Sequence, residues 1–598
     1  MLSQADIGLL QQALGLLRAG QPAQAGGTLA RLSAAGQQHP DALYLAALAG
    51  DGLGRVGDAE QLFRAAIDRA PGNAGYRNSY ALFLSRLGRG AEAVAALEAA
   101  VAAAPDHAEA WLNLALLRQE RGDLDGAAPA LGRAAALTPE APRVLAATGA
   151  LAQARGDAPA ARAALTRAVE RDPADLGARA RLAKALGQQG DVAAALAALG
   201  AAEDPQLATI RADLLADAGQ MDEAVAAYRA VATRWPGHAE ALTSLAFLLP
   251  QLGQPEAALD GFRDALAGDA ATPGLWQAAL AAARGSGDGA TLLDWAAAAE
   301  RRFGLAPEWR LARLTGLRLL CRFAEALDEV RTEQARFPAE PGLANHRAWL
   351  ALRQGELDEA EAAALTASRM IPLEQTAWSL LSVIWRLKQD PREAWLIDYD
   401  RLVRTADLVV PDGWSSRAAF LGDLRRVLEA RHVTRNAPSE QTLRGGTQTR
   451  GELFATTDPV LIAFRDALRR TVEQSLAGLA PQTGHPFLGR LTGRVRLVGS
   501  WSVRLQGQGF HVSHIHPQGW LSSAFYVALP PEVGSGGEAG ALTFGTPDAS
   551  LGLDLEPRRV VIPQAGRLAI FPSYAWHGTV PFHSESPRLT AAFDALPV

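Results

Sequence analysis

The first two thirds of the chain alternate between apolar positions at helical spacing and short polar turns. In "AEAWLNLALLRQERGDLDGAAPALGRAAALTP" (108–139), apolar side chains recur every three or four residues on both sides of the turn "GD". This spacing predicts two amphipathic helices that form a hairpin. One hairpin cannot bury its own apolar face, so we expect neighbouring hairpins to stack on one another.

The hairpin recurs with a period of 34 residues, and a glycine occupies most of its turns. A glycine ends a helix or allows a tight turn, and the small residue five positions later lets the two helices pack closely. Leu292 is the exception to that small residue. The turn positions, with one shorter unit after the sixth, are Gly20, Gly54, Gly88, Gly122, Gly156, Gly190, Gly219, Gly253, Gly287, Cys321, Gly355 and Gln389.

This period and these small-residue positions resemble tetratricopeptide repeats. We count about twelve units, some of them degenerate, between residues 6 and 408. The resemblance implies an all-α superhelical solenoid whose concave groove binds a protein or peptide.

Beyond residue 410 the pattern changes to strands. "GSWSVRLQ" (499–506) alternates between apolar and polar residues, and short stretches of similar character follow between Gly and Pro turns. With no helices between them, they predict an antiparallel sandwich or barrel. The further strands are expected at 520–530, 540–545, 558–563, 566–572 and 587–594.

Residues 409–494 are expected to connect the repeats to these strands and to support them. The polar, glycine-rich stretch 435–454 predicts a loop, which is either a lid or a plain connection. Residues 458–479 predict a helix, with Asp458 as its N-cap and a proline in its first turn.

The stretch "HVSHIHPQGW" (511–520) contains three histidines within six positions. On a strand, His514 and His516 would project to one face and His511 to the other. Two adjacent imidazoles repel when protonated, and burying both without partners is costly, so a bound metal would resolve both problems. The alternative is an exposed polar strand edge.

A second group of polar residues lies near the C-terminus. His577 follows a predicted strand, and Arg588 and Thr590 are two residues apart, on one strand face. A guanidinium and a hydroxyl that point the same way suit a carboxylate.

Together these motifs resemble the iron(II)- and 2-oxoglutarate-dependent oxygenases of the prolyl-hydroxylase-like branch. "LSSAFYVALP", "GALTFGTP" and "GRLAIFPSYAWHG" add to that resemblance. It implies an α+β domain with a double-stranded β-helix (jelly-roll) core over 495–598. It also implies Fe(II) held by His514 and His577, and 2-oxoglutarate bound by Arg588 and Thr590. Tyr526 is a candidate hydrogen-bond partner of the cosubstrate, or a packing residue.

The chain departs from the family pattern at one position, because His516 replaces the usual Asp ligand. Three arrangements are open: His516 is itself the third ligand, Glu538 supplies a carboxylate, or two histidines and water hold the iron. Strand parity favours His516. We expect His511 to be a surface or outer-sphere group, and Arg567 to be a weaker rival of Arg588.

Composition and net charge limit the classes of binding partner that we expect. A net charge of −6 over 598 residues argues against nucleic acid or an anionic membrane as partner, and no apolar stretch is long enough to span a bilayer. The N-terminal stretch lacks the features of a signal peptide, and Cys321 is the only cysteine, so we expect a cytoplasmic protein.

The expected function is a 2-oxoglutarate-dependent hydroxylase acting on a protein or peptide side chain that the repeats recruit. Two alternatives remain: a repeat scaffold with a catalytically degenerate metal-binding β-domain, or an oxygenase for a small molecule or glycan.

Overall fold

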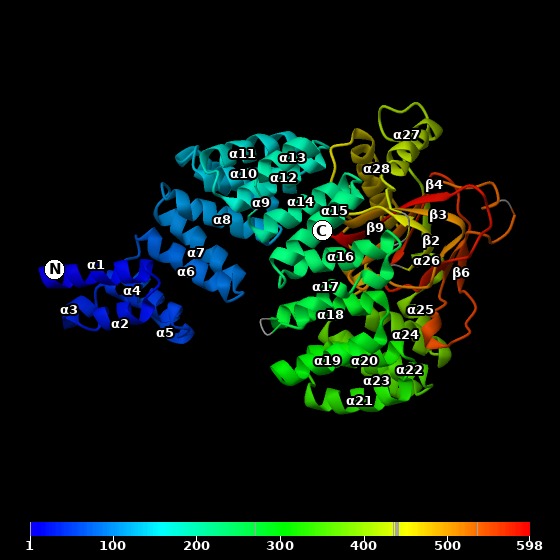
Figure 1. The fold of residues 1–598 in the computed structure, drawn as a ribbon, viewed down its shortest axis with the longest axis horizontal. Coiled ribbons are helices and arrows are strands. Elements are labelled where there is room, and N and C mark those ends of the chain that lie inside the picture. Colours follow the sequence, from blue (N-terminus) through cyan, green and yellow to red (C-terminus); the bar gives the residue numbers. More distant parts are fainter. Residues whose placement is uncertain (1, 202, 269–270, 435, 437–441, 535) are drawn as a thin grey trace. The chain divides into compact units, whose positions relative to one another are not determined.

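The computed structural model describes residues 2–201, 203–268, 271–434, 436, 442–534 and 536–598, in two compact units. The first unit comprises Met1–Gly187 and Ala193–Leu199, and the second comprises Gln188–Val192 and Gly200–Val598. Within its described residues, the first unit contains helices and no strand (Figure 1). These helices are α1 (Gln4–Arg18), α2 (Pro22–Leu29), α3 (Ala34–Gln37), α4 (Pro40–Gly52), α5 (Val56–Arg69), α6 (Ala74–Arg86), α7 (Gly90–Ala103), α8 (Ala108–Glu120), α9 (Leu124–Leu137), α10 (Pro142–Ala154), α11 (Ala158–Arg171), α12 (Leu176–Gln188) and α13 (Val192–Leu199).

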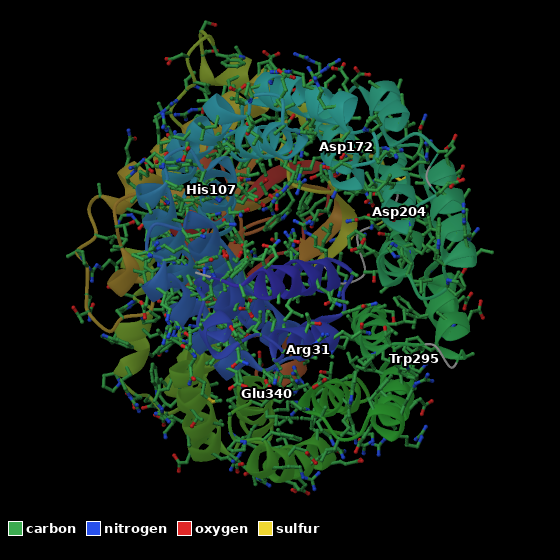
Figure 2. The ribbon with its side chains drawn as sticks, turned by 90° about the vertical axis from the view of Figure 1, so that its left-hand side faces the viewer. Arg31, His107, Asp172, Asp204, Trp295 and Glu340 are labelled. Atoms are coloured by element: carbon green, nitrogen blue, oxygen red, sulfur yellow. The ribbon has the colours of Figure 1, made fainter. Side chains whose placement is uncertain are left out.

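Helical hairpins continue in the second unit up to residue 402. Figure 2 shows them along a curve on which Asp204, Trp295 and Glu340 mark successive places. They are α14 (Pro205–Asp217), α15 (Met221–Arg234), α16 (Ala239–Gln251), the 3-10 helix η1 (Pro255–Ala257), α17 (Asp260–Leu266), α18 (Pro273–Ser286), α19 (Gly289–Phe303), α20 (Pro307–Leu319), α21 (Phe323–Arg336), α22 (Pro341–Arg353), α23 (Leu357–Met370), α24 (Thr376–Leu387), α25 (Arg392–Leu396) and α26 (Tyr399–Leu402). Among the described residues, no helix is both long enough and apolar enough to cross a membrane.

Every predicted turn position adopts the left-handed backbone conformation. The glycines of the series have φ between 70° and 84°, and Cys321 and Gln389 have φ of 56° and 54°. A residue with a Cβ atom is strained there by ~1–2 kcal/mol. The stacked repeats therefore impose the turn even where the residue itself does not favour it.

The strands of the second unit pair antiparallel throughout. A six-stranded sheet has the order β1-β7-β4-β9-β3-β2, and a three-stranded sheet has the order β6-β5-β8. The sheets pack on each other, since the rings of Phe544 and Phe571 meet edge-on with centroids 4.9 Å apart. The predicted fold class, all-α repeats followed by a domain built on two antiparallel sheets, is confirmed. The strands are β1 (Arg404–Asp407), β2 (Leu443–Gln448), β3 (Val495–His511), β4 (Leu521–Ala528), β5 (Leu542–Phe544), β6 (Arg559–Val561), β7 (Arg567–Pro572), β8 (His577–Thr579) and β9 (Arg588–Pro597).

Two helices pack on the larger sheet, α27 (Arg417–Glu429) and α28 (Pro459–Leu476). The helix predicted from residue 458 is confirmed, because the Asp458 carboxylate accepts hydrogen bonds from the amides of Val460 and Leu461. Phe464 of α28 packs on Phe525 of β4, with ring centroids 4.9 Å apart. Two short 3-10 helices, η2 (Leu488–Arg490) and η3 (Ala549–Leu551), lie in the connections.

The hydrophobic core runs without a break from the repeats into the sheets. One cluster of buried side chains extends from Leu314 of α20 to Ala595 of β9. Hydrogen bonds cross the same boundary: the Tyr574 hydroxyl donates to the Leu396 carbonyl at 2.7 Å, and the Trp576 indole donates to the Ser379 carbonyl at 3.0 Å.

Two local expectations were wrong. Part of the stretch predicted as a loop is strand β2, which pairs with β3 through a bulge at Gly445; residues 435 and 437–441 of that stretch lie outside the described residues. At the end of the expected repeat region, residues 404–407 form the short strand β1 and pair with β7. Finally, β3 ends at His511, so His514 and His516 lie in the following segment and not on a common strand.

Candidate metal centre

The backbone brings His514 and His577 together. The His514 amide donates to the His577 carbonyl at 2.9 Å, and the His577 amide donates to the His514 carbonyl at 3.0 Å, which makes an isolated antiparallel bridge. The two imidazole rings lie 4.1 Å apart, centroid to centroid. Two residues distant in sequence are thus fixed next to each other by main-chain hydrogen bonds.

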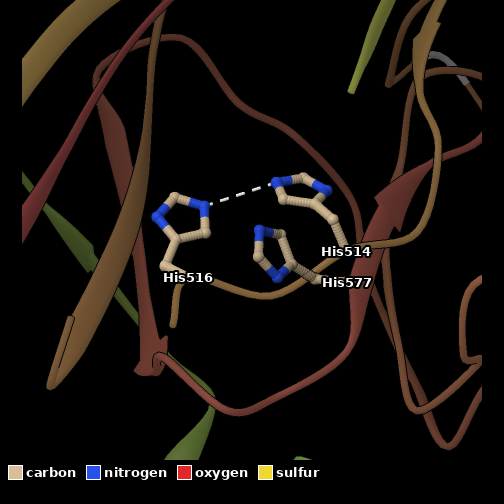
Figure 3. A group of neighbouring side chains, drawn as sticks. All are labelled: His514, His516 and His577. Carbon is tan, nitrogen blue, oxygen red and sulfur yellow. Dashed lines mark hydrogen bonds between the residues drawn. The ribbon is translucent and has the colours of Figure 1, made fainter. Parts of the chain in front are cut away.

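His516 completes the cluster. Its Nε2 lies 3.3 Å from Nε2 of His514, and one possible ligand atom of each of the three histidines lies within 4.8 Å of the other two. Figure 3 shows the three rings grouped together, with the dashed line joining His514 and His516. Ring stacking of Trp501 on His516, at 5.7 Å between centroids, holds the third imidazole in place.

The hydrogen bonds of the three rings select one tautomer. Nδ1–H of His514 donates to the Val512 carbonyl, and Nδ1–H of His577 donates to the Ala575 carbonyl, both at 2.9 Å. Nδ1 of His516 contacts the Asp594 carboxylate at 2.7 Å. With each Nδ1 carrying its proton, Nε2 keeps a free lone pair. Two such lone pairs 3.3 Å apart repel unless a cation lies between them, so the donor set fits a metal ion.

Burial keeps His514 and His577 uncharged. It holds the pKa of both His514 and His577 well below the usual value, and the neighbouring histidines lower it further. A metal ligand must be a neutral imidazole, so these two residues are ready to bind a metal at neutral pH.

Arg588 lies in the same cavity, of about 360 Å³, together with His511 and the three clustered histidines. Its Nη1 donates to the Gly540 carbonyl at 2.8 Å, while its Nε is buried without a partner. The guanidinium lies over the Tyr526 ring, 5.1 Å from its centroid, and the Tyr526 hydroxyl is also buried without a partner. A buried cation without an ion-pair partner is costly, so the Arg588 end of the cavity fits a carboxylate. Tyr526 is not among the residues that line the cavity.

Strand alternation places the cavity residues of β9. Arg588, Thr590, Ala592 and Asp594 are two residues apart, and all line the cavity. Thr590 is paired with Tyr526 of β4 on one side and with Val503 of β3 on the other. Arg588 and Thr590 therefore line the same cavity as the three histidines.

Residues 499–594 match the family described as "Putative 2OG-Fe(II) oxygenase". Over these residues the C-terminal domain is similar to this putative oxygenase family. Four segments of the region before it, 10–74, 82–142, 211–274 and 345–407, match the tetratricopeptide repeat family. Both resemblances predicted from the sequence are thereby confirmed.

Solved structures similar to the chain include repeat proteins. A tetratricopeptide repeat protein from Parabacteroides merdae is 15% identical, with 39% of this chain and 93% of that chain covered and a TM-score of 0.32. A thermophilic repeat protein from Thermus thermophilus is 27% identical, with 30% of this chain and 99% of that chain covered and a TM-score of 0.27. No curated protein matches the chain significantly.

Asp594 of the oxygenase domain was not predicted as a site residue. Its carboxylate contacts Nδ1 of His516 with both oxygens, at 2.7 and 2.9 Å, and accepts a hydrogen bond from the Ser522 hydroxyl at 2.7 Å. The family pattern has a carboxylate ligand where this chain has His516. In this chain the negative charge belongs to Asp594, which lies behind the His516 imidazole. It makes Nε2 of that ring a stronger electron-pair donor to a metal. The signal that could have revealed Asp594 is its even spacing from Arg588, which places both residues on the same face of a strand.

We expect Asp594→Asn to weaken Fe(II) binding about 10- to 100-fold. The neutral amide removes the charge behind His516 and can present its NH₂ group to Nδ1, which would move the imidazole proton to Nε2. Isothermal titration under argon measures the affinity. Asp554→Asn, at an exposed carboxylate, is the matched control. Equal affinities of the two variants would show that Asp594 has no such role.

Three further predicted residues can now be placed. His511, expected to be a surface or outer-sphere group, lines the cavity, and burial lowers its pKa to about 3. Glu538 is exposed, and the group of possible ligand atoms found among the described residues comprises the three histidines. Arg567, the rival of Arg588, pairs with Asp407 at 3.1 Å.

Proposed function

We propose that the protein is an Fe(II)- and 2-oxoglutarate-dependent hydroxylase that acts on a polypeptide side chain. The observation that carries this proposal is the chamber of about 360 Å³ that contains both the three histidines and the buried guanidinium of Arg588. The family match over 499–594 supports the same chemistry.

His514, His516 and His577 would hold Fe(II) through Nε2. Their Nδ1 atoms are already engaged, so each ring is oriented before the metal arrives. Histidine in place of the usual carboxylate ligand leaves the metal with a larger net positive charge. Asp594 offsets part of it, and a dianionic cosubstrate offsets more.

Arg588 would bind the far carboxylate of 2-oxoglutarate, with Thr590 and the Tyr526 hydroxyl beside it. Burial raises the pKa of Tyr526, so its hydroxyl stays protonated and can donate to an anion. The apolar side chains of Leu542 and Phe571, which line the same chamber, limit access of water. When bound, Fe(II) and 2-oxoglutarate would, together with O2, convert a C–H bond to C–OH: one oxygen atom of O2 enters the product and the other enters succinate as 2-oxoglutarate loses carbon dioxide.

A polypeptide substrate is favoured because repeat helices form one wall of a second cavity that reaches His514. Tetratricopeptide repeats generally mediate protein interactions, and here they would bring the substrate to the metal. A small-molecule substrate and a non-catalytic scaffold remain the alternatives.

Anaerobic addition of Fe(II) and 2-oxoglutarate to the full-length protein tests the proposal. We expect a weak visible charge-transfer band that forms only when both are present, and slow succinate release after oxygen is admitted. Metal binding without the band and without succinate would support the scaffold and contradict the hydroxylase.

A further inference from the structure

A second cavity, of about 700 Å³, lies between the repeat helices α18 to α24 and the metal centre. His514 and Trp576 form part of its wall, and His514 also lines the chamber that contains Arg588. Cavities of ~300–1,000 Å³ hold ligands of several hundred daltons. A molecule in the second cavity would therefore meet the metal centre at His514, on a side separate from the cosubstrate.

Arg318, on α20, is the notable residue of this cavity. Its Cζ lies over the Trp349 ring, 3.7 Å from the centroid. Its Nε is buried without a hydrogen-bond partner, and among the described residues no carboxylate lies within ion-pair distance of it. Burial lowers its pKa to about 10, so the side chain remains charged at neutral pH. A guanidinium without an ion-pair partner suits a planar anion such as a carboxylate.

Other donors line the cavity with Arg318. The Trp309 indole N–H is buried and unpaired, and so is Nδ1 of His346. Burial, with the charges of Arg318 and Arg284 adding to it, lowers the pKa of His346 to about 3, so the ring is neutral and one nitrogen can donate. Unpaired buried donors cost free energy that a ligand with several acceptor lone pairs would recover.

Neither acidic residue of the cavity, Glu308 or Asp548, forms an ion pair with Arg318. The Asp548 carboxylate accepts a hydrogen bond from the Ser550 amide at 2.9 Å as the cap of η3, and although its charge raises the pKa of Arg318, it forms no ion pair with it. Glu308 is exposed in the first turn of α20. The guanidinium therefore remains open to an external anion.

We propose that Arg318, Trp309 and His346 form a carboxylate subsite, which selects substrates with an acid group near the carbon that is hydroxylated. The connection of this subsite to catalysis rests on the proposed function. Its ability to bind a carboxylate does not depend on that function. The cavity is larger than a free dicarboxylic acid needs, so an acidic side chain of a polypeptide is the expected source of the carboxylate.

Binding to the full-length protein tests this subsite. The probes are acetylated, amidated hexapeptides that differ only in having Asp, Glu, Asn or Gln at one position, with N-acetyl-aspartate and N-acetyl-glutamate as free-acid probes. Titrations are made without oxygen, with Zn(II) and saturating 2-oxoglutarate present, so that free acids do not bind at Arg588. We expect an acidic peptide to bind about 10- to 100-fold more tightly than its amide counterpart.

Variants assign that preference to Arg318. Arg318→Met keeps an apolar stem on Trp349 and should remove the preference, whereas Arg318→Lys keeps the charge without the planar fork and should retain part of it. Arg234→Met, which removes another arginine stacked on a tryptophan, is the matched control. If Arg318→Met does not fold, the Arg318→Lys titration carries the test. No acid preference in the wild type, or one that both Arg318 variants retain in full, overturns the proposal.

The remaining outcomes distinguish a peptide from a small acid as the ligand, and the carboxylate subsite from the proposed hydroxylase function. Equal binding of free acids and acidic peptides supports the subsite and assigns it to a small acid. A wild type that fails to bind 2-oxoglutarate, yet keeps an acid preference dependent on Arg318, supports the subsite and contradicts the hydroxylase. Normal 2-oxoglutarate binding with no acid preference supports the hydroxylase and contradicts the subsite.

Discussion

Fe(II) binding is expected to fall by at least about 100-fold when His577 is replaced with alanine, because even the outer partners of metal ligands cost 10- to 100-fold. The backbone bridge to His514 uses main-chain atoms and survives the substitution. The side chain lines a cavity, so its removal leaves most of the packing intact. Anaerobic calorimetry measures the affinity, and Fe(II) should raise the melting temperature of the wild type but not of the variant.

His583→Ala is the control for this experiment, since His583 is exposed in the loop after β8. It should bind Fe(II) like the wild type. If His577→Ala retains wild-type affinity and the metal-induced rise in melting temperature, His577 is not a ligand and the proposed metal centre is wrong.

Arg588→Met is expected to lower 2-oxoglutarate affinity strongly while Fe(II) affinity stays near that of the wild type. Removing one partner of a buried charge pair costs ~2–5 kcal/mol, which corresponds to roughly 30-fold to several thousand-fold in affinity. The Tyr526 ring, over which the guanidinium lies, can pack against the methionine instead. Titration of the Fe(II)-loaded protein without oxygen measures the effect.

Arg567→Met distinguishes the two arginines. Arg567 pairs with Asp407 outside the chamber, so its loss should leave 2-oxoglutarate affinity unchanged. Arg588→Lys should recover part of the affinity lost in Arg588→Met, because it restores charge without two parallel hydrogen bonds. A larger effect of Arg567→Met than of Arg588→Met would reverse the assignment.

The repeat region was predictable because its signal is periodic. The period of 34 residues located the left-handed turns even at Cys321 and Gln389, where no glycine marks them. The glycine-rich stretch that became strand β2 was not predictable in this way. Its composition favours a loop, and only its pairing with β3, which depends on the tertiary fold, makes it a strand.

The three histidines singled out in the sequence lie together, but not through the geometry that the sequence suggested. His514 and His516 do converge, but the cause is the backbone bridge to His577 and the stacking of Trp501, rather than shared strand parity. Asp594 has the right alternation from Arg588, yet its contact with His516 depends on how β9 lies beside the segment after β3. Such contacts between distant segments have no local sequence signal.

The unbroken apolar cluster from α20 to β9 also limits how such a protein can be divided or reshuffled. A gene fragment that starts near residue 409 would lack Leu396 and Ser379, whose carbonyls pair with Tyr574 and Trp576. Its sheets would lose the apolar side chains that the last repeats pack against them. Recombination that transfers the C-terminal domain to another protein must therefore carry the last repeats with it, and whole repeats can be gained or lost only upstream of α20.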